Sequence, residues 1–384
     1  MNRQPFLERR LVPTESPAVI AAITGGAIIL ALILGALLFI PLGVNPLYAY
    51  ADMFRLGFGD LRGFGFTLVK ATPLIFVALG TIFAWRSGFF YLGFEGALLI
   101  GAAAAVWLAL MAAPGNVLAQ LPAVLFFPLV FVVSFIAGGV WAGIVGVMRA
   151  RFGGNEVIVS LMMNFVAIFL VNYLVSGPLR APGDLPQTAR IPANTALPFI
   201  IPGTRAHAGI LVALLCAFVL WFVMRKTPTG YQQIVAGLNP RAARYAGINV
   251  GKRLLLAAFV AGGLGALGGL VEILGVQFRL LDGLAEGTGF LGLVVALLGK
   301  LHPIGVIIAA TLYAGMEVGA DVMQRRAGIP SSVVFTIQSL IVLLILASDI
   351  LRYYRLNLSS LRPRSLRRSS SPADGETVTT THEG

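Results

Sequence analysis

LLLAAFVAGGLGALGGLVEILGVQ, residues 254–277, contains a single charged side chain, Glu272. A helix needs about 20 consecutive apolar residues to cross a hydrocarbon core about 30 Å thick, so this segment is predicted to span a membrane. Gly265 and Gly269 lie four residues apart, which favours close packing against a neighbouring helix. The G-x-G-x-x-G pattern at 263–268 also matches a dinucleotide-binding motif, but the strand that must precede that motif is missing from this apolar run.

The 384-residue chain as a whole has the same character, with 58% hydrophobic and only 11% charged residues. Soluble domains carry about 25% charged residues, which indicates an integral membrane protein. We therefore predict an all-α fold: a polytopic membrane protein with about ten transmembrane helices, which form one transmembrane domain over residues 18–351. The expected spans are 18–42, 67–85, 89–112, 122–148, 156–176, 207–224, 254–277, 289–300, 303–320 and 331–351.

The distribution of Lys and Arg predicts the orientation. With residues 1–17 in the cytoplasm, nineteen Lys and Arg residues lie inside and eight outside, which is the bias expected of membrane proteins. Residues 225–253 and the basic tail, 352–384, are then cytoplasmic as well, and the tail is expected to be disordered. The net charge of +12 fits this orientation and contact with anionic membrane lipid, so no nucleic-acid partner is expected.

Residues 177–206 form an external loop that contains six prolines. Proline restricts the backbone and cannot continue a helix, so the loop is expected to be stiff and extended. Docking of a partner and a simple long connection between two spans are both compatible with this composition.

A cationic stretch, AGLNPRAARYAGINVGKR, residues 236–253, separates two apolar runs. Asn239 is a good helix cap, Pro240 fits the first helical turn, and Gly247 is a good helix stop. The stretch predicts a two-turn cytoplasmic helix, with two small residues, Ala242 and Ala243, that allow close approach of another surface. On the residues alone, contact with a protein partner and contact with anionic headgroups fit equally well. The residues concerned are Asn239, Pro240, Arg241, Ala242, Ala243, Arg244 and Gly247.

Sequence patterns of hydrolases and metal sites are missing from the chain. It contains no G-x-S-x-G, H-E-x-x-H or C-x-x-C, and its three histidines are scattered. We therefore expect no catalytic residue, no bound cofactor and no metal ligand, and a transport role in place of an enzymatic one. Any hydrolysis that drives transport would occur on another polypeptide.

Polar side chains inside the expected spans are the remaining signal, because a charge at the bilayer centre costs at least about 2.5–3.5 kcal/mol. Glu156 lies near a cytoplasmic end, where water or Arg149 and Arg151 can stabilise it. Glu272 lies deepest and is expected to face protein or a water-filled path. Structural hydrogen bonding and contact with a solute both remain open. The polar candidates are Lys70, Glu95, Glu156, Asn164, Glu272, Gln277 and Glu317, and those assigned to a translocation path are Glu95, Asn155, Glu156, Asn164 and Glu272.

One short pattern occurs twice. Residues 92–99 and 291–298 share Leu-Gly-x-x-x-Ala-Leu-Leu, and the predicted topology runs them in opposite directions through the membrane. Inverted repeats are common in transporters, although chance alone can produce such a match in a chain rich in Leu, Ala and Gly.

Four segments resemble the permease subunits of ABC importers. RSGFFYLGFEGALLIG at 86–101 resembles that family's "RaGlfNiGxEGQxxxGa" segment, and GGNEVIVSLMMN at 153–164 resembles its "G.nEVIxtxMxN" segment. GLNPRAARYAGI at 237–248 resembles its cytoplasmic loop, and GTGFLGLVVALLG at 287–299 resembles its late "GxGFxGIaVALLG" segment. The most similar branch imports nucleosides and related simple sugars. Two departures, Tyr91 in place of Asn and Ala97 in place of Gln, lie in a segment expected to line the path.

The resemblance implies a permease of the bacterial inner membrane that conducts a nucleoside or similar small polar solute inward. It further implies a dimer with a second permease chain or a second copy, two cytoplasmic ATPase subunits that bind ATP, and an external substrate-binding lipoprotein. The short helix within 236–253 would fit a groove on the ATPase. A monosaccharide importer is the alternative within the family, and an ion-coupled secondary carrier is the alternative from another class.

Overall fold

The computed structural model describes residues 7–9, 17–116, 118–285, 287–327 and 330–356. Apart from two three-residue strands, the regular structure of these residues is helical, which confirms the all-α part of the predicted fold class. The inverted repeat remains a prediction. The helices are α1 (Pro17–Phe39), α2 (Pro46–Phe58), α3 (Leu61–Arg86), α4 (Phe94–Met111), α5 (Ala123–Phe152), α6 (Glu156–Ser176), α7 (Gly209–Lys226), α8 (Pro228–Leu238), α9 (Pro240–Tyr245), α10 (Val250–Glu272), α11 (Thr288–Leu298), α12 (Pro303–Ala327) and α13 (Ser331–Tyr353). The short elements are η1 (Ile40–Leu42), η2 (Ala193–Thr195), the π-helical turn η3 (Ile273–Gln277) and the antiparallel strands β1 (Leu7–Arg9) and β2 (Tyr354–Leu356).

Among the described residues, seven helices are long and apolar enough to cross a membrane: α3, α4, α5, α6, α7, α10 together with η3, and α12. The chain is thus a multi-pass membrane protein. The expected spans 18–42, 289–300 and 331–351 correspond to α1, α11 and α13, whose apolar stretches are shorter, so ten crossings remain a prediction. At a rise of 1.5 Å per residue, the eleven-residue α11 is about 16 Å long, too short to cross the hydrocarbon core by itself.

Besides α9, two helices, α2 and α8, lie outside the expected spans. Each begins with the signal recognised at Asn239, a capping side chain followed by proline. Asn45 accepts a hydrogen bond from the backbone N–H of Leu47, and Thr227 accepts one from Gly230. Pro46 and Pro228 then occupy the first helical turn, where the missing N–H costs nothing.

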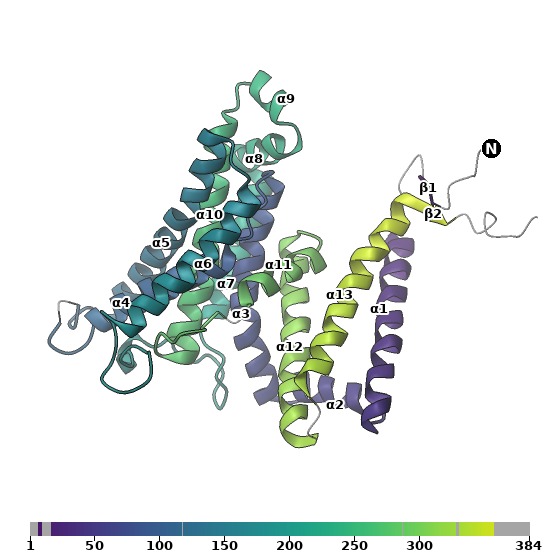
Figure 1. Ribbon diagram of the computed structural model, residues 1–384, viewed down its shortest axis with the longest axis horizontal. Coiled ribbons are helices and arrows are strands. Elements are labelled where there is room, and N and C mark those ends of the chain that lie inside the picture. Colours follow the sequence, from purple (N-terminus) through teal and green to yellow (C-terminus); the bar gives the residue numbers. More distant parts are fainter. Residues whose placement is uncertain (1–6, 10–16, 117, 286, 328–329, 357–384) are drawn as a thin grey trace, which may run out of the picture.

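Helix α10 is central to the described structure and packs against α3, α4 and α5 (Figure 1). The close approach expected at Gly265 and Gly269 is confirmed. A methyl group built on Gly269 would overlap the carbonyl oxygen of Leu98 in α4, and one on Gly265 would lie 3.1 Å from the ring of Phe94. Because small residues let the helix backbones touch, α10 and α4 form a continuous core with α3.

The two ends of the helices differ. Helices α8 and α9 lie at the same end as the β1–β2 pair (Figure 1). At the other end, the proline-rich loop 177–206 contains η2, turns and isolated β-bridges. It follows the end of α10, with hydrogen bonds from the N–H of Ile191 to the carbonyl of Phe278 and from the N–H of Leu197 to the carbonyl of Leu274. The loop is therefore packed against the helices at that end. Residues 357–384, most of the tail expected to be disordered, lie outside the described residues, and α13 extends past the expected boundary at 351 to Tyr353.

Candidate functional site

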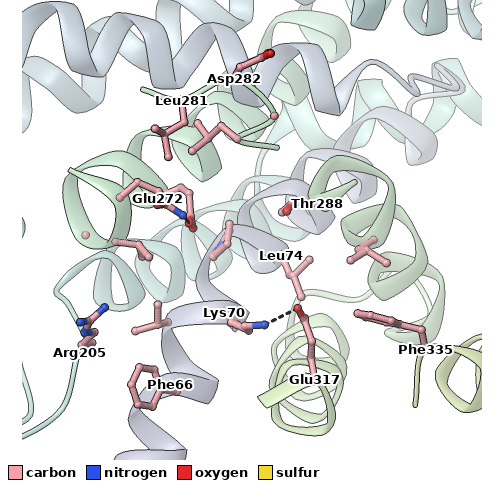
Figure 2. A pocket seen from close by; sticks show the side chains of 18 residues that line it. Phe66, Lys70, Leu74, Arg205, Glu272, Leu281, Asp282, Thr288, Glu317 and Phe335 are labelled. Carbon is pink, nitrogen blue, oxygen red and sulfur yellow. Dashed lines mark hydrogen bonds and ion pairs between the residues drawn. The ribbon is translucent and has the colours of Figure 1, made fainter. Parts of the chain in front are cut away.

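A cavity of about 430 Å³ lies between α3, the end of α10, α12 and the segment that follows η3 (Figure 2). It is in the half of the helices away from α8, because Lys70 belongs to the first half of α3 whereas the other end of α3 touches α8. There, a methyl group built on Gly88 would lie 2.9 Å from Cα of Gly237. The charged and aromatic side chains that line the cavity are Lys70, Arg205, Glu272, Asp282, Glu317, Phe66 and Phe335.

An ion cluster occupies one wall of this cavity. The Nζ of Lys70 donates hydrogen bonds to Glu317 Oε1 at 2.6 Å and to Asp321 Oδ2 at 2.8 Å. The two carboxylates lie four residues apart and therefore share one face of α12. The side chains of Lys70 and Asp321 are about one-third exposed, at 35% and 33%, so the protein does not fully enclose the cluster. Sequence analysis identified Lys70 and Glu317 but missed Asp321, although its spacing from Glu317 was a readable signal.

Glu272 also lines the cavity, at the junction of α10 and η3. Its Oε1 accepts a hydrogen bond of 3.2 Å from Nε2 of Gln277, so two of the polar residues expected within spans contact each other. Single π-helical turns are frequent at functional sites. Of the residues assigned to a path from the sequence, Glu272 is the one that lines this cavity.

Glu95 lies elsewhere, at the junction of α4 and α11. Its carboxylate is buried and accepts hydrogen bonds from the backbone N–H of Gly287 at 2.7 Å and of Gly289 at 2.8 Å. The first turns of two helices meet at this carboxylate, and the partial positive charge of a helix N-terminus favours an anion there. Thr288 and Leu291 of α11 line the cavity, so Glu95 positions a wall of the cavity without being part of its surface.

Asn164 fixes the chain that enters α4. Its side-chain oxygen accepts a hydrogen bond of 2.8 Å from the N–H of Gly96, and its Nδ2 donates one of 3.0 Å to the carbonyl of Leu92. The two departures from the family pattern lie in the same segment. Tyr91 and Ala97 are fully buried and do not line the cavity, and the Tyr91 hydroxyl donates to the carbonyl of Gly93. These substitutions thus affect the packing of α4.

Asn155 and Glu156 lie at the start of α6, away from the cavity. Asn155 caps the helix by accepting a hydrogen bond of 3.0 Å from the N–H of Val157. Glu156 Oε2 lies 3.1 Å from Nε of Arg149, which confirms the expected stabilisation by that arginine.

The short helix predicted within 236–253 is present as α9. Asn239 accepts hydrogen bonds from the N–H of Arg241 at 3.1 Å and of Ala242 at 3.0 Å, and Gly247 has a φ of 77°, so the predicted start and stop are confirmed.

Ala243 differs from the expectation, because it is fully buried against Ala236 and Val250 of the same chain. It anchors α9 and offers no contact surface, so only Ala242 remains available for close approach.

The exposed side of α9 carries Pro240, Arg241, Ala242, Arg244 and Gly247. Two further residues, missed in the sequence, extend this surface. Tyr245 is 94% exposed and Leu238 is 81% exposed. Tyrosine and arginine are among the residue types enriched at the centres of protein interfaces.

Within the described residues, no group of three or more His, Cys, Asp and Glu side chains is arranged to hold a metal ion.

Comparison with known proteins gives a family for most of the chain. Residues 63–347 match the family model described as "Branched-chain amino acid transport system / permease component". A guanosine ABC transporter permease of Bacillus subtilis is 37% identical and covers 85% of this chain and 93% of its own length. A glucose ABC transporter permease of Haloferax volcanii is 35% identical, covering 90% and 91%. A nucleoside ABC transporter permease of Lactococcus lactis is 31% identical, covering 83% and 88%.

None of the solved structures matches the chain. The family match and these three relatives each extend over most of the chain. The family and all three relatives are permease components of transport systems, which are not themselves enzymes. The protein is therefore a member of this family of ABC transporter permeases.

Proposed function

We propose that this chain is the membrane-spanning subunit of an ABC importer that moves a nucleoside across the bacterial inner membrane. The composition of the cavity carries the proposal. Its volume of about 430 Å³ is in the usual range of about 300–1,000 Å³ for small-molecule sites. Positive and negative side chains both line it, which suits a polar solute without a large net charge. Phe66 and Phe335 are both exposed and line it too, and aromatic rings stack favourably on a planar base.

Import of a monosaccharide is the second candidate. It is supported by the similarity to a glucose permease, which extends over 90% of this chain, and by the same mixture of hydrogen-bonding side chains. The two exposed phenylalanines favour the nucleoside, because a planar base gains more than a sugar from stacking on a ring.

The partners follow from the same proposal. Two ATPase subunits bind ATP and contact the exposed side of α9, a second permease chain or a second copy completes a transmembrane dimer, and a lipoprotein delivers the solute from outside. This chain holds no cofactor. Both termini are cytoplasmic and α1, α11 and α13 complete ten spans. The location of β1–β2 and α9 at the same end of the helices supports this orientation (Figure 1).

The substrate is tested with the complete complex in liposomes loaded with ATP, by measuring uptake of labelled guanosine and labelled glucose. Phe66→Leu and Phe335→Leu remove the ring but keep an apolar side chain, and each should reduce guanosine uptake by up to about tenfold, since stacking contributes about 0.5–1.5 kcal/mol. Phe64→Leu is the matched control, because Phe64 is exposed on the same helix but does not line the cavity. Uptake of glucose with no competition from guanosine would contradict the nucleoside proposal.

The contact with the ATPase is tested by two neighbouring substitutions. Ala242→Asp adds a charge to an exposed position, so the variant should fold normally but lose the ATPase subunit or hydrolyse ATP without uptake. Ala243→Asp buries a charge in α9 packing and should instead lower the yield of folded protein. Full ATPase assembly and full uptake in Ala242→Asp would contradict the proposed contact.

A further inference from the structure

A second cavity, of about 320 Å³, lies at the opposite end of the helices from the first. It is formed by the last turns of α3 and α7, by α8 and by the turn between α11 and α12. Its lining residues are Ile82, Arg86, Trp221, Met224, Arg225, Ile234, His302 and Pro303. The transport path proposed above does not involve any of them.

Basic side chains from three elements converge on this cavity. Arg86 ends α3, Arg225 is in the last turn of α7, and His302 lies in the turn that precedes α12. None of the lining residues is acidic, and the ion pairs found in the described part of the chain involve other residues. The C-termini of α3 and α7 carry partial negative charge, which offsets the charges of the two arginines only in part. The cavity therefore favours an anion.

The turn between α11 and α12 has an unusual backbone. Lys300 and Leu301 have φ values of 53° and 51°, in the left-handed region that residues other than glycine rarely adopt. Hydrogen bonds hold the turn, among them those from the N–H of Leu301 to Ala296 and of His302 to Gly299. This fixed turn places His302 beside the ends of α3 and α7.

The remaining lining residues are apolar or aromatic. Ile82 and Met224 are buried beneath the cavity, whereas Ile234 and Trp221 are partly exposed in it. Tryptophan is enriched at the membrane–water interface. A cationic rim combined with an apolar surface suits an amphiphile more closely than it suits a free inorganic ion. Basic pockets between helices on the cytoplasmic side are recognised sites for anionic lipid headgroups.

We propose that this cavity binds an anionic phospholipid of the cytoplasmic leaflet. Its phosphate lies between Arg86, Arg225 and His302, and its glycerol and first acyl carbons lie on Trp221 and Ile234. The proposal rests on the orientation given above, in which α8 and α9 are cytoplasmic, but it does not depend on the identity of the solute.

The test uses the purified full-length permease in its native oligomer, with lipids retained on the protein counted by native mass spectrometry. Phosphatidylglycerol and phosphatidylcholine are offered in equal amounts, and inorganic phosphate is added in a separate arm. The wild type should retain more phosphatidylglycerol than phosphatidylcholine. In the double variant Arg86→Gln/Arg225→Gln, the ratio of retained phosphatidylglycerol to phosphatidylcholine should fall by about tenfold or more. Lys226→Gln removes the same charge from a neighbouring residue that does not line the cavity, and should retain the preference.

Three results would overturn the proposal. In the first, Lys226→Gln loses as much lipid as the double variant, which would indicate a diffuse charge effect. In the second, phosphate binds to the wild type without any preference for phosphatidylglycerol, which would indicate a site for free phosphate. In the third, the double variant loses ATPase assembly but keeps its bound lipid, which would assign the cavity to the ATPase. Because lipid retention is measured without transport, failure here is distinguishable from failure of the proposed import function. A thermal unfolding curve of each variant confirms that it is folded.

Discussion

Glu95 and Lys70 are charged side chains of neighbouring helices, and the structure stabilises them in opposite ways. Glu95 is 7% exposed, and both of its oxygens accept hydrogen bonds from backbone N–H groups of the segment that starts α11. Lys70 is 35% exposed on the cavity wall and contacts only side chains, those of Glu317 and Asp321. The charge of Glu95 is stabilised by backbone groups, whereas the charge of Lys70 is stabilised by carboxylate side chains that can change partners.

This difference separates a structural charge from charges available to a solute. Backbone N–H groups at the start of α11 cannot move without moving the helix, so Glu95 fixes the relative position of α4 and α11. The carboxylates that contact Lys70 are partly exposed, so they can exchange a bond with Lys70 for a bond with a solute or water. The sequence marks both positions equally, as charges within apolar runs.

The largest effect is expected for Glu95→Ala. The substitution leaves the N–H groups of Gly287 and Gly289 unpaired in a buried site, at about 1–3 kcal/mol for each group. Folded yield and the midpoint of thermal unfolding in detergent should both fall sharply. Glu95→Gln retains one acceptor oxygen and should lie between Glu95→Ala and the wild type. Wild-type thermal stability of Glu95→Ala would show that the carboxylate does not hold α11.

An intermediate effect is expected for Lys70→Met. Uptake should fall by about tenfold or more, whereas stability should fall by only about 1–2 kcal/mol, because the carboxylates left behind are partly exposed. Adding Glu317→Gln to this variant removes the charge repulsion and should restore stability without restoring uptake. If the double variant regained uptake together with stability, the cluster would be structural in the same sense as Glu95, and the comparison would fail.

The smallest effect is expected for Arg149→Ala, which removes the ion pair with Glu156. The arginine side chain is 41% exposed, so solvent screens the pair, and exposed pairs contribute about 0–1 kcal/mol. Glu156 remains in the first turn of α6, where the helix N-terminus stabilises it. Thermal unfolding and uptake should stay close to wild type. A loss as large as that of Glu95→Ala would mean that this end of α6 is far less solvated than its exposure indicates.

Local signals in the sequence identified some features and missed others of the same kind. The cap at Asn239 and the stop at Gly247 were correctly identified, since both depend on neighbouring residues only. The same cap-and-proline signal at Asn45 and Thr227 predicts α2 and α8, but these helices lie outside the apolar runs on which the span assignment was based. Asp321 was missed because the expected span ended at residue 320, one residue before it, although its side chain contacts Lys70 as Glu317 does.

The sequence by itself determined that this protein is an all-helical membrane permease, because a low charge content, long apolar runs and family motifs are properties of contiguous residues. Only the tertiary structure decided which polar residues face a cavity. Glu272 lines it, whereas Glu95 and Asn164 bind the backbone at the start of α11 and α4, and Ala243 packs inside its own loop. The physical reason is that a charge in an apolar run must find a partner, but the sequence does not show whether that partner is a backbone group, a side chain or water.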